Sequence, residues 1–326
     1  MKATAIAPAN IAFIKYWGRK DKILRLPLNT SISMNLSGAY TTTTVEFYSE
    51  LKADDIHLVD GQFSEGENKR INKHLDRIRD RAKMQLFANV VTQNSFPKGT
   101  GIASSASGFA ALTVAGCVAA GLTLSEKELS ILARIGSGSA CRSIPNGFVE
   151  WTEGESHTTS YAYSLFPAGW WNLRDILLVV SDQEKKVSSS AGMEQVNTSP
   201  LLPQRLTLLP VRIERVNKAI QEKNFAVLGK IIEEDCLEMH QVMQTQKSPL
   251  NYLNKTTTGI MTAVRSWRRD GLEVYFTIDA GPNVHLICEG KNEQLVTHKV
   301  KQIPGVVQVI INKPSEGTHL VESHLF

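Results

Sequence analysis

The chain has 326 residues, of which 42% are hydrophobic and 21% are charged, and this ordinary globular composition excludes a fibrous repeat or a long disordered tail. Its 36 basic and 32 acidic residues leave a net charge of +4 that is spread along the chain. The basic clusters are short, which is weak support for nucleic-acid binding and mild support for a small anionic substrate. The longest apolar stretch, 110–122, is too short to span a membrane, and the N-terminus shows no signal-peptide pattern.

Short runs rich in β-branched and aromatic residues predict strands at 41–47, 86–92, 148–151, 176–180, 274–278, 284–288 and 306–311. Apolar periodicity predicts helices at 68–83, 105–120, 126–135, 205–221, 225–243, 256–269 and 293–302. Ser125 and Glu128 have the spacing of a capping box at the start of the third helix, and Gly271 is placed to end the sixth.

The predicted strands come in clusters and do not alternate strictly with helices, which favours an α+β fold over a doubly wound parallel sheet. The stretch 182–203 is rich in Ser, Gln, Asn, Thr and Pro and lies between a strand and a long helical region. We therefore predict a boundary near residue 182 that divides the chain into domains 1–182 and 183–326.

The four cysteines, at positions 117, 141, 236 and 288, form no Cys-x-x-Cys pair. Together with the missing export signal, this spacing predicts reduced thiols in a cytoplasmic protein. The histidines show no His-Glu-x-x-His spacing, so we expect no zinc site built from protein ligands.

The most informative segment, 97–108, follows a predicted strand and leads into a helix of small residues. Gly99 and Gly101 let the backbone turn tightly and present its N–H groups, while Ser104 and Ser105 can cap the helix and offer hydroxyls. Such a loop at a helix N-terminus favours phosphate binding, although no Gly-Lys-Ser/Thr closes it as in a Walker A loop. A glycine-rich turn that merely caps a buried helix explains the segment about equally well.

Two further segments each place one charged residue among small or turn-forming ones. Arg142 lies in the small-residue segment 136–143, where its guanidinium could grip a carboxylate or phosphate, or could simply be solvated on a surface loop. Asp279 leaves a strongly β run and could act as a base or a charge anchor, or could only start a turn. In each case the purely structural alternative is favoured when the segment is taken alone.

A fourth segment, 10–21, places three cations beside the two aromatic residues Tyr16 and Trp17. It could bind an anionic ligand. An edge strand with a solvated basic end is the favoured alternative when this segment is taken alone.

In their order along the chain, these segments closely resemble diphosphomevalonate decarboxylases of the GHMP kinase superfamily. The motifs are Asn-Ile-Ala-x-Ile-Lys-Tyr-Trp-Gly, Gly-x-Ala-Ser-Ser-Ala-Ser-Gly, Gly-Ser-Gly-Ser-Ala-Cys-Arg-Ser and Asp-Ala-Gly-Pro-Asn. The resemblance runs from about Ala3 to Asn283, and the motifs of Arg142 and Asp279 are specific to the decarboxylase branch. It implies an N-terminal domain like the second domain of ribosomal protein S5 and a ferredoxin-like C-terminal domain, with the active site between them.

The resemblance also implies the reaction and its partners. ATP phosphorylates the tertiary 3-hydroxyl of a 5-phosphorylated mevalonate, and loss of that phosphate and of carbon dioxide leaves the isopentenyl product. We accordingly expect ATP and Mg²⁺ as cofactors, a homodimer, and neither nucleic acid nor membrane as a partner.

Residue roles follow by matching motif positions. Asp279 matches the family aspartate beside the 3-hydroxyl, as base or electrostatic group; Arg142 matches the arginine that holds the substrate carboxylate; and Lys15 matches a lysine near the reacting groups. The expected substrate-binding residues are Tyr16, Arg19, Ser137, Ser139, Ser190 and Met193. The expected ATP-binding residues are Lys98, Gly99, Gly101, Ala103, Ser104 and Ser105, of which Ser104 or Ser105 would also help to hold magnesium.

Three positions depart from the family pattern. Arg19 stands where relatives often have Lys, and 145–147 reads Pro-Asn-Gly where the family usually has Phe-Gly-Gly or Tyr-Gly-Gly. Ser190 stands where many bacterial relatives have an arginine that grips the diphosphate, although eukaryotic relatives also lack it. The loss of that cation raises the alternative that the substrate is mevalonate 5-monophosphate and the product isopentenyl phosphate.

Two other hypotheses remain beside the decarboxylase. A GHMP kinase could phosphorylate a small molecule without decarboxylation, but the intact motifs of Arg142 and Asp279 argue against it. A non-catalytic binding protein on this scaffold would be expected to have lost Asp279 or the glycine- and serine-rich loop, and this chain has lost neither.

Overall fold

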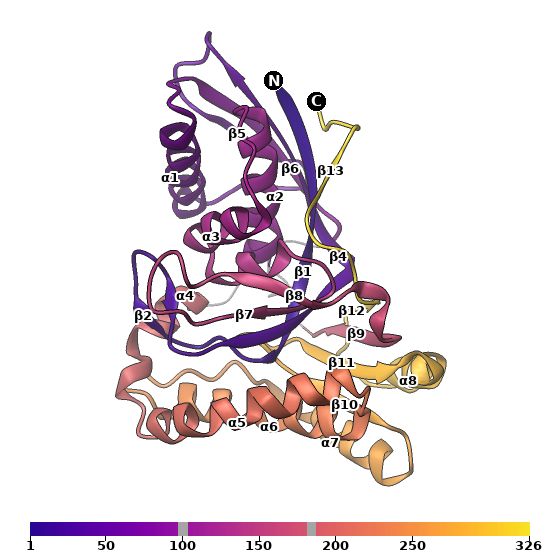
Figure 1. Cartoon of the computed structure of the whole chain (residues 1–326). Helices are drawn as coiled ribbons and strands as arrows, with labels where there is room; N and C mark the ends of the chain where they lie inside the picture. Colours follow the sequence, from indigo (N-terminus) through magenta and orange to yellow (C-terminus); the bar gives the residue numbers. More distant parts are fainter. Residues whose placement is uncertain (97–103, 181–186) are drawn as a thin grey trace.

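The computed structural model describes residues 1–96, 104–180 and 187–326. These residues form two β-sheets, each covered by helices and joined through a shared core, with a small hairpin of β2 (Arg19–Asp21) and β3 (Leu26–Pro27) at one side (Figure 1). The α+β class predicted from the clustering of the strands is confirmed.

The first sheet is built around its two longest strands, β1 and β4, which pair antiparallel. Its order is β13-β1-β4-β6-β5, and the first part of β4 also pairs with β7, which pairs with β8. Only the β5–β6 pairing is parallel among the strands described. The strands are β1 (Lys2–Ile14), β4 (Ser31–Tyr48), β5 (Asp55–Leu58), β6 (Phe87–Asn94), β7 (Phe148–Trp151), β8 (Ala162–Phe166) and β13 (His319–Val321).

β1 lies inside this sheet, between β13 and β4, and nearly all of its side chains are buried. The alternative interpretation of 10–21 as an edge strand with a solvated basic end is wrong for its end, because the Lys15 side chain is buried. Residues 10–14 themselves pair with β4 alone among the described strands, since β13 reaches only Thr4, Ala5 and Ile6. Because both faces of β1 are covered, its residues show no alternation of apolar and polar side chains, and the strand escaped prediction for that reason.

Three α-helices and a 3₁₀ helix pack on the first sheet: α1 (Glu65–Ala82), α2 (Ser104–Ala119), α3 (Glu126–Gly136) and η1 (Gly138–Ser143). α2 is apolar almost all round because it is enclosed between the sheet and the other helices. The predicted capping box of Ser125 and Glu128 is confirmed, and Ser64 and Glu67 form a second one at the start of α1.

The second sheet is antiparallel, in the order β10-β11-β9-β12. Its strands are β9 (Leu173–Val179), β10 (Val274–Thr277), β11 (Val284–Glu289) and β12 (Gln308–Asn312). Three long helices run along one side of this sheet (Figure 1): α5 (Leu202–Gln221), α6 (Phe225–Thr245) and α7 (Lys255–Arg269). The shorter helices are α4 (Ser189–Gly192), η2 (Ala168–Trp170), η3 (Met193–Thr198), η4 (Gly290–Asn292) and α8 (Glu293–Val300).

One hydrophobic cluster joins the two sheets. It contains Ile11 and Phe13 of β1 together with Leu177 of β9 and Ile231 of α6, all buried. The boundary predicted near residue 182 lies outside the described residues, and β9 before it already belongs to the second sheet. The shared core places the end of β1 directly against α6, where the site described next is found.

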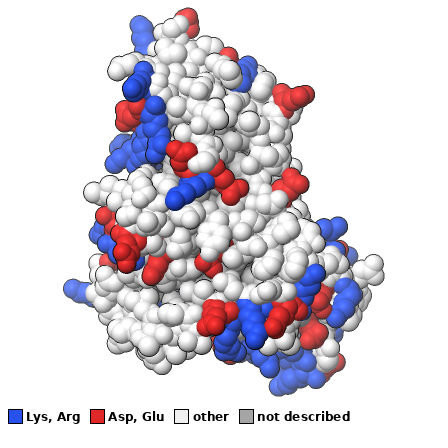
Figure 2. Space-filling view, in the orientation of Figure 1, with Lys and Arg blue, Asp and Glu red and all other residues white. Residues whose placement is uncertain are grey.

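Basic side chains gather over α1 on the face shown in Figure 2. This helix carries Lys69, Arg70, Lys73, Arg77, Arg79 and Arg81. Elsewhere on that face, acidic and basic side chains are interspersed.

Candidate active site

A cavity of about 410 Å³ lies where the end of β1 meets α6 and the turn after β10. All of the predicted site residues that the structure describes line it: Lys15, Tyr16, Arg19, Ser104, Ser105, Ser137, Ser139, Arg142, Ser190, Met193 and Asp279. The predicted ATP-binding residues Lys98, Gly99, Gly101 and Ala103 lie outside the described residues. Segments separated by more than 250 residues in the chain therefore meet around one space.

Lys15 and Asp279 form an ion pair in the cavity wall, with Lys15 Nζ 2.6 Å from Asp279 Oδ1. Lys15 follows the last residue of β1 and Asp279 comes just after β10, so the pair joins the two sheets. The Lys15 side chain is 1% exposed, whereas that of Asp279 is 33% exposed. The lysine is thus enclosed by protein, and the carboxylate faces the cavity.

The surroundings of Asp279 favour its charged form. Burial alone would raise the pKa of this carboxyl, but the positive charge and hydrogen bond of Lys15, with smaller contributions from His285 and Arg142, hold the pKa below its usual range. Asp279 is therefore a carboxylate at neutral pH. It is a good hydrogen-bond acceptor and a weak base.

Arg142 lies in η1 and is almost fully buried, and burial lowers its pKa. Its Nε and Nη2 both donate to Asn10 Oδ1, at 3.2 and 3.1 Å, and its Nη1 donates to Ser31 Oγ at 2.8 Å. Among the described residues no carboxylate lies within ion-pair distance of this guanidinium. A buried cation with only neutral partners at the wall of a cavity is suited to hold an anionic ligand group.

Tyr16, Arg19 and Ser190 form a second polar group at the cavity wall. Arg19 Nε donates to Tyr16 Oη at 3.0 Å, and Arg19 Nη2 donates to Ser190 Oγ at 2.8 Å. The Tyr16 ring packs against Trp151 and so close to Gly138 that a Cβ there would lie 2.7 Å from the phenol oxygen. Gly138 is therefore required for the position of Tyr16.

Two arginines of the cavity, Arg25 and Arg70, were not predicted from the sequence. Arg70 Nη2 donates to Gly136 O at 3.2 Å, and Arg25 Nε donates to Ile135 O at 3.0 Å. Burial, with the nearby charges of Arg19 and Arg70, lowers the pKa of Arg25 to about 10. Both residues come from segments without a recognisable motif, and only the folded chain brings them to the C-terminal end of α3.

Cations dominate the lining of the cavity among the described residues. The cavity has two acidic lining residues, Glu67 and Asp279, and five basic ones: Lys15, Arg19, Arg25, Arg70 and Arg142. Such an excess in an enclosed space favours a ligand with several negative charges.

Serine hydroxyls lie at the start of α2 and beside η1. Ser104 and Ser105 begin α2, and Ser105 Oγ lies 3.1 Å from Ser137 Oγ. No group of three or more His, Cys, Asp or Glu side chains that could enclose a metal occurs in the part of the chain that the structure describes. The oxygen donors present suit Mg²⁺, which keeps several waters and is commonly held through ligand phosphates with few protein ligands.

A smaller, more apolar cavity of about 70 Å³ adjoins the first and shares Glu67, Arg70, Ser104 and Ser105 with it. Its other lining residues come mainly from α1, α2, β5 and β6 and include Phe63, Ile71, Val90, Phe109 and Leu112. The two cavities together offer a charged space beside an apolar one.

None of the helices described is long and apolar enough to cross a membrane.

Family models match both halves of the chain. Residues 7–162 match the diphosphomevalonate decarboxylase-like N-terminal domain, and residues 176–321 match the mevalonate 5-diphosphate decarboxylase C-terminal domain. The diphosphomevalonate decarboxylase of Candida albicans is 36% identical over 312 residues, which cover 90% of this chain and 86% of that protein.

Solved structures show the same similarity. The mevalonate diphosphate decarboxylase of Staphylococcus aureus superposes with a TM-score of 0.92 at 39% identity, over 98% of both chains. That of Enterococcus faecalis gives a TM-score of 0.92 at 38% identity over 99% of both chains. A further structure, described as MDDEF in complex with MVAPP, AMPPCP and magnesium, gives 0.92 at 39% identity over 99% of both chains.

Proposed function

The chain belongs to the diphosphomevalonate decarboxylase family, and from this premise we propose how its cavity carries out the family reaction. The function is the ATP-dependent decarboxylation of mevalonate 5-diphosphate to isopentenyl diphosphate, with ADP, phosphate and carbon dioxide as the other products. The observation that carries the assignment of roles is the Lys15–Asp279 pair beside a buried Arg142 with no carboxylate partner among the described residues.

Asp279 orients the tertiary 3-hydroxyl. Because Lys15 holds its pKa low, the carboxylate accepts a hydrogen bond from the hydroxyl without removing the proton from the free alcohol. The proton becomes acidic enough to transfer to Asp279 only as the hydroxyl oxygen bonds to the γ-phosphorus. Lys15 then offsets the charge that develops near the transferred phosphoryl group.

Arg142 holds the substrate carboxylate in the second half of the reaction. Departure of the 3-phosphate leaves positive charge at a tertiary carbon, and loss of carbon dioxide from the adjacent carboxylate supplies the electron pair that forms the double bond. A carboxylate fixed by a guanidinium anchored on Asn10 and Ser31 keeps the breaking bond aligned with that carbon.

The 5-diphosphate lies at the end of the cavity formed by Tyr16, Arg19 and Ser190, with Ser137, Ser139 and Met193 beside it. Ser190 Oγ accepts a hydrogen bond from Arg19, so a cation remains at this position although Ser190 itself is neutral. Arg25 adds a further positive charge. These charges support the diphosphate as the substrate over mevalonate 5-monophosphate.

The N-terminus of α2 and Arg70 would hold the phosphates of ATP, and the adjoining apolar cavity would take its adenine. The α2 N-terminus and the serine hydroxyls favour negative charge, and Phe63 and Phe109 offer apolar surface to the base. Ser104 or Ser105, together with the nucleotide phosphates, would hold Mg²⁺, which neutralises phosphate charge when bound.

We also propose a homodimeric assembly and a cytoplasmic location, both of which the family resemblance implies. Size-exclusion chromatography with light scattering tests the assembly.

The test combines product analysis with an Asp279→Asn variant. Wild-type protein with ATP, Mg²⁺ and carboxyl-labelled mevalonate 5-diphosphate is expected to release labelled carbon dioxide and ADP in equal amounts. Loss of a catalytic group lowers rates by roughly 10²–10⁴-fold, and we expect a loss of kcat in this range for Asp279→Asn, with nucleotide binding retained.

The matched control is Asp54→Asn, which alters a buried carboxylate paired with Arg79 away from the cavity. ADP formation without carbon dioxide would instead identify a kinase. A folded Asp279→Asn variant with activity close to wild type would remove Asp279 from the mechanism.

A further inference from the structure

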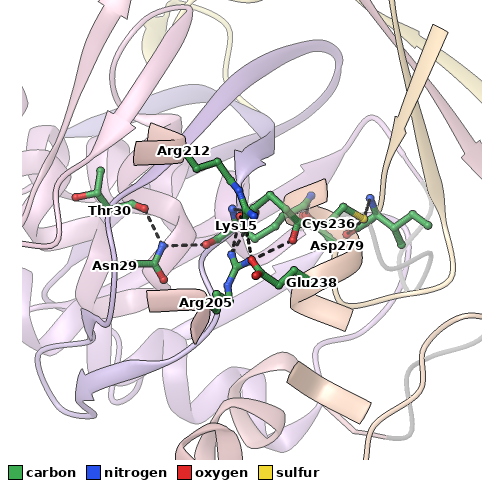
Figure 3. A network of polar contacts seen from close by, with 10 residues as sticks. Lys15, Asn29, Thr30, Arg205, Arg212, Cys236, Glu238 and Asp279 are labelled. Carbon is green, nitrogen blue, oxygen red and sulfur yellow. Dashed lines mark hydrogen bonds and ion pairs between the residues drawn. The ribbon is translucent and has the colours of Figure 1, made fainter. Parts of the chain in front are cut away.

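A cluster of four charged side chains lies behind the cavity and has no part in the roles assigned so far. α5 contributes Arg205 and Arg212, and α6 contributes Glu238, as Figure 3 shows. The fourth residue, Asp235, also belongs to α6. Both arginines contact both carboxylates, and Asp235 is fully buried. None of the four lines the cavity.

Asp235 also contacts the main chain of Lys15. The Lys15 backbone N–H donates to Asp235 Oδ2 at 2.7 Å, and the Lys15 carbonyl accepts from Asn29 Nδ2 at 3.1 Å. Both polar groups of this residue's main chain are therefore held by side chains. Glu238 makes no hydrogen bond or ion pair with Lys15, although it contacts the same two arginines.

The next residue of α6, Cys236, contacts the main chain of the residue that precedes Asp279. Cys236 Sγ accepts from the Ile278 N–H at 3.1 Å and donates to the Ile278 carbonyl at 3.4 Å. Ile278 directly precedes Asp279. Burial raises the pKa of the Cys236 thiol to about 11, so its hydrogen remains available for this contact.

We propose that Asp235 is a positioning residue for decarboxylation, because it fixes the main chain of Lys15 and thereby the placement of the Lys15 ammonium against Asp279. Arg205 and Arg212 hold the carboxylate of Asp235 in place, and Asn29 completes the support from the opposite side of Lys15. Since α6 also anchors Ile278, one helix sets the separation of two residues that come from different sheets. This inference rests on the roles proposed above for Lys15 and Asp279.

Small displacements in this pair would be costly. Misplacement of a reacting group by about 1 Å can lower a rate by about a hundredfold, although binding contacts elsewhere persist. A shifted Lys15 would also hold the pKa of Asp279 down less effectively. Loss of positioning therefore has two signatures: a lower kcat with little change in KM, and an acid limb of the kcat profile that moves to higher pH.

The experiment compares Asp235→Ala with Glu238→Gln. Both weaken the contacts of the same two arginines, but only the first removes the acceptor for the Lys15 N–H. We expect Asp235→Ala to lower kcat by about tenfold or more, with KM for both substrates within about threefold and the acid limb displaced upward. Glu238→Gln should leave all three quantities near wild type. Asp235→Asn retains an acceptor oxygen and should recover most of kcat.

A second pair keeps the test decisive if Asp235→Ala does not fold. Asn29→Ala removes the donor to the Lys15 carbonyl, whereas Thr30→Ala in the same turn removes only a hydroxyl that accepts from the Glu153 N–H. The first should show both signatures and the second neither.

Equal losses within either pair, or an unchanged pH profile in folded Asp235→Ala and Asn29→Ala variants, would overturn the positioning role. Asp279→Asn separates this outcome from failure of the proposed function. An inactive Asp279→Asn beside a fully active Asp235→Ala refutes only the inference made here.

Discussion

Replacing Arg142 with lysine keeps the positive charge and removes the planar fork of donors. In the structure that fork reaches Asn10 with two nitrogens and Ser31 with a third. Lysine offers a single ammonium on a flexible chain, so it cannot be fixed on Asn10 and Ser31 while it also grips a substrate carboxylate in a defined orientation.

The expected size of the effect follows from one lost charge-assisted contact. A hydrogen bond to a charged group contributes about 1.5–3 kcal/mol. Because about 1.4 kcal/mol corresponds to tenfold in rate, kcat/KM for mevalonate 5-diphosphate should fall roughly tenfold to a hundredfold. The KM for ATP should change little, because the hydrogen bonds of Arg142 go to Asn10 and Ser31 and not to the serines that begin α2.

The assay is steady-state ADP and carbon dioxide release, with thermal unfolding to confirm the fold. The control is Arg79→Lys, since Arg79 is also buried and makes two hydrogen bonds to Asp54, outside the cavity. That variant should lose stability and keep kcat/KM. A folded Arg142→Lys variant with near-normal kcat/KM, or an equal loss in Arg79→Lys, would refute the carboxylate grip.

Two further predictions concern charges in the same cavity. Lys15→Met removes the main positive charge that offsets the effect of burial on the pKa of Asp279. That pKa should therefore rise, and the acid limb of the kcat–pH profile should move to higher pH. An acid limb that does not move would contradict the Lys15–Asp279 pair. Ser190→Arg adds a cation beside Arg19. The ratio of kcat/KM for mevalonate 5-diphosphate to kcat/KM for mevalonate 5-monophosphate should therefore increase by roughly tenfold to a hundredfold. An unchanged ratio would show that Ser190 does not face the terminal phosphate.

Much of the fold could be predicted because local patterns agree with the final structure. The run 148–151 coincides with β7, and the capping box of Ser125 marks the first residue of α3. β1 and the first part of β4 escaped prediction because they are covered on both faces and rich in small or polar residues. Their place is decided by pairing across the sheet and by packing under α2, neither of which is visible locally.

The residues of the candidate site likewise fall into those that the sequence could predict and those that it could not. Lys15, Arg142 and Asp279 lie in compact motifs beside glycines and turns, where a short stretch of sequence carries the signal. Arg25, Arg70 and Asp235 lie in a hairpin and on two charged helices, where one more basic or acidic residue is unremarkable. Their importance arises from the tertiary arrangement, which brings buried charge together from distant segments.

The return of the chain into the first sheet has a consequence for dissecting the protein. β13 follows every strand of the second sheet in sequence, yet it pairs with β1 along Thr4, Ala5 and Ile6 (Figure 1). A fragment cut between the two family domains would leave β1 with open hydrogen-bonding groups along this edge, a template for association with other chains. Each half expressed as a separate polypeptide should therefore self-associate. Co-expression of the two halves should restore a soluble complex, because β13 of one fragment can pair with β1 of the other.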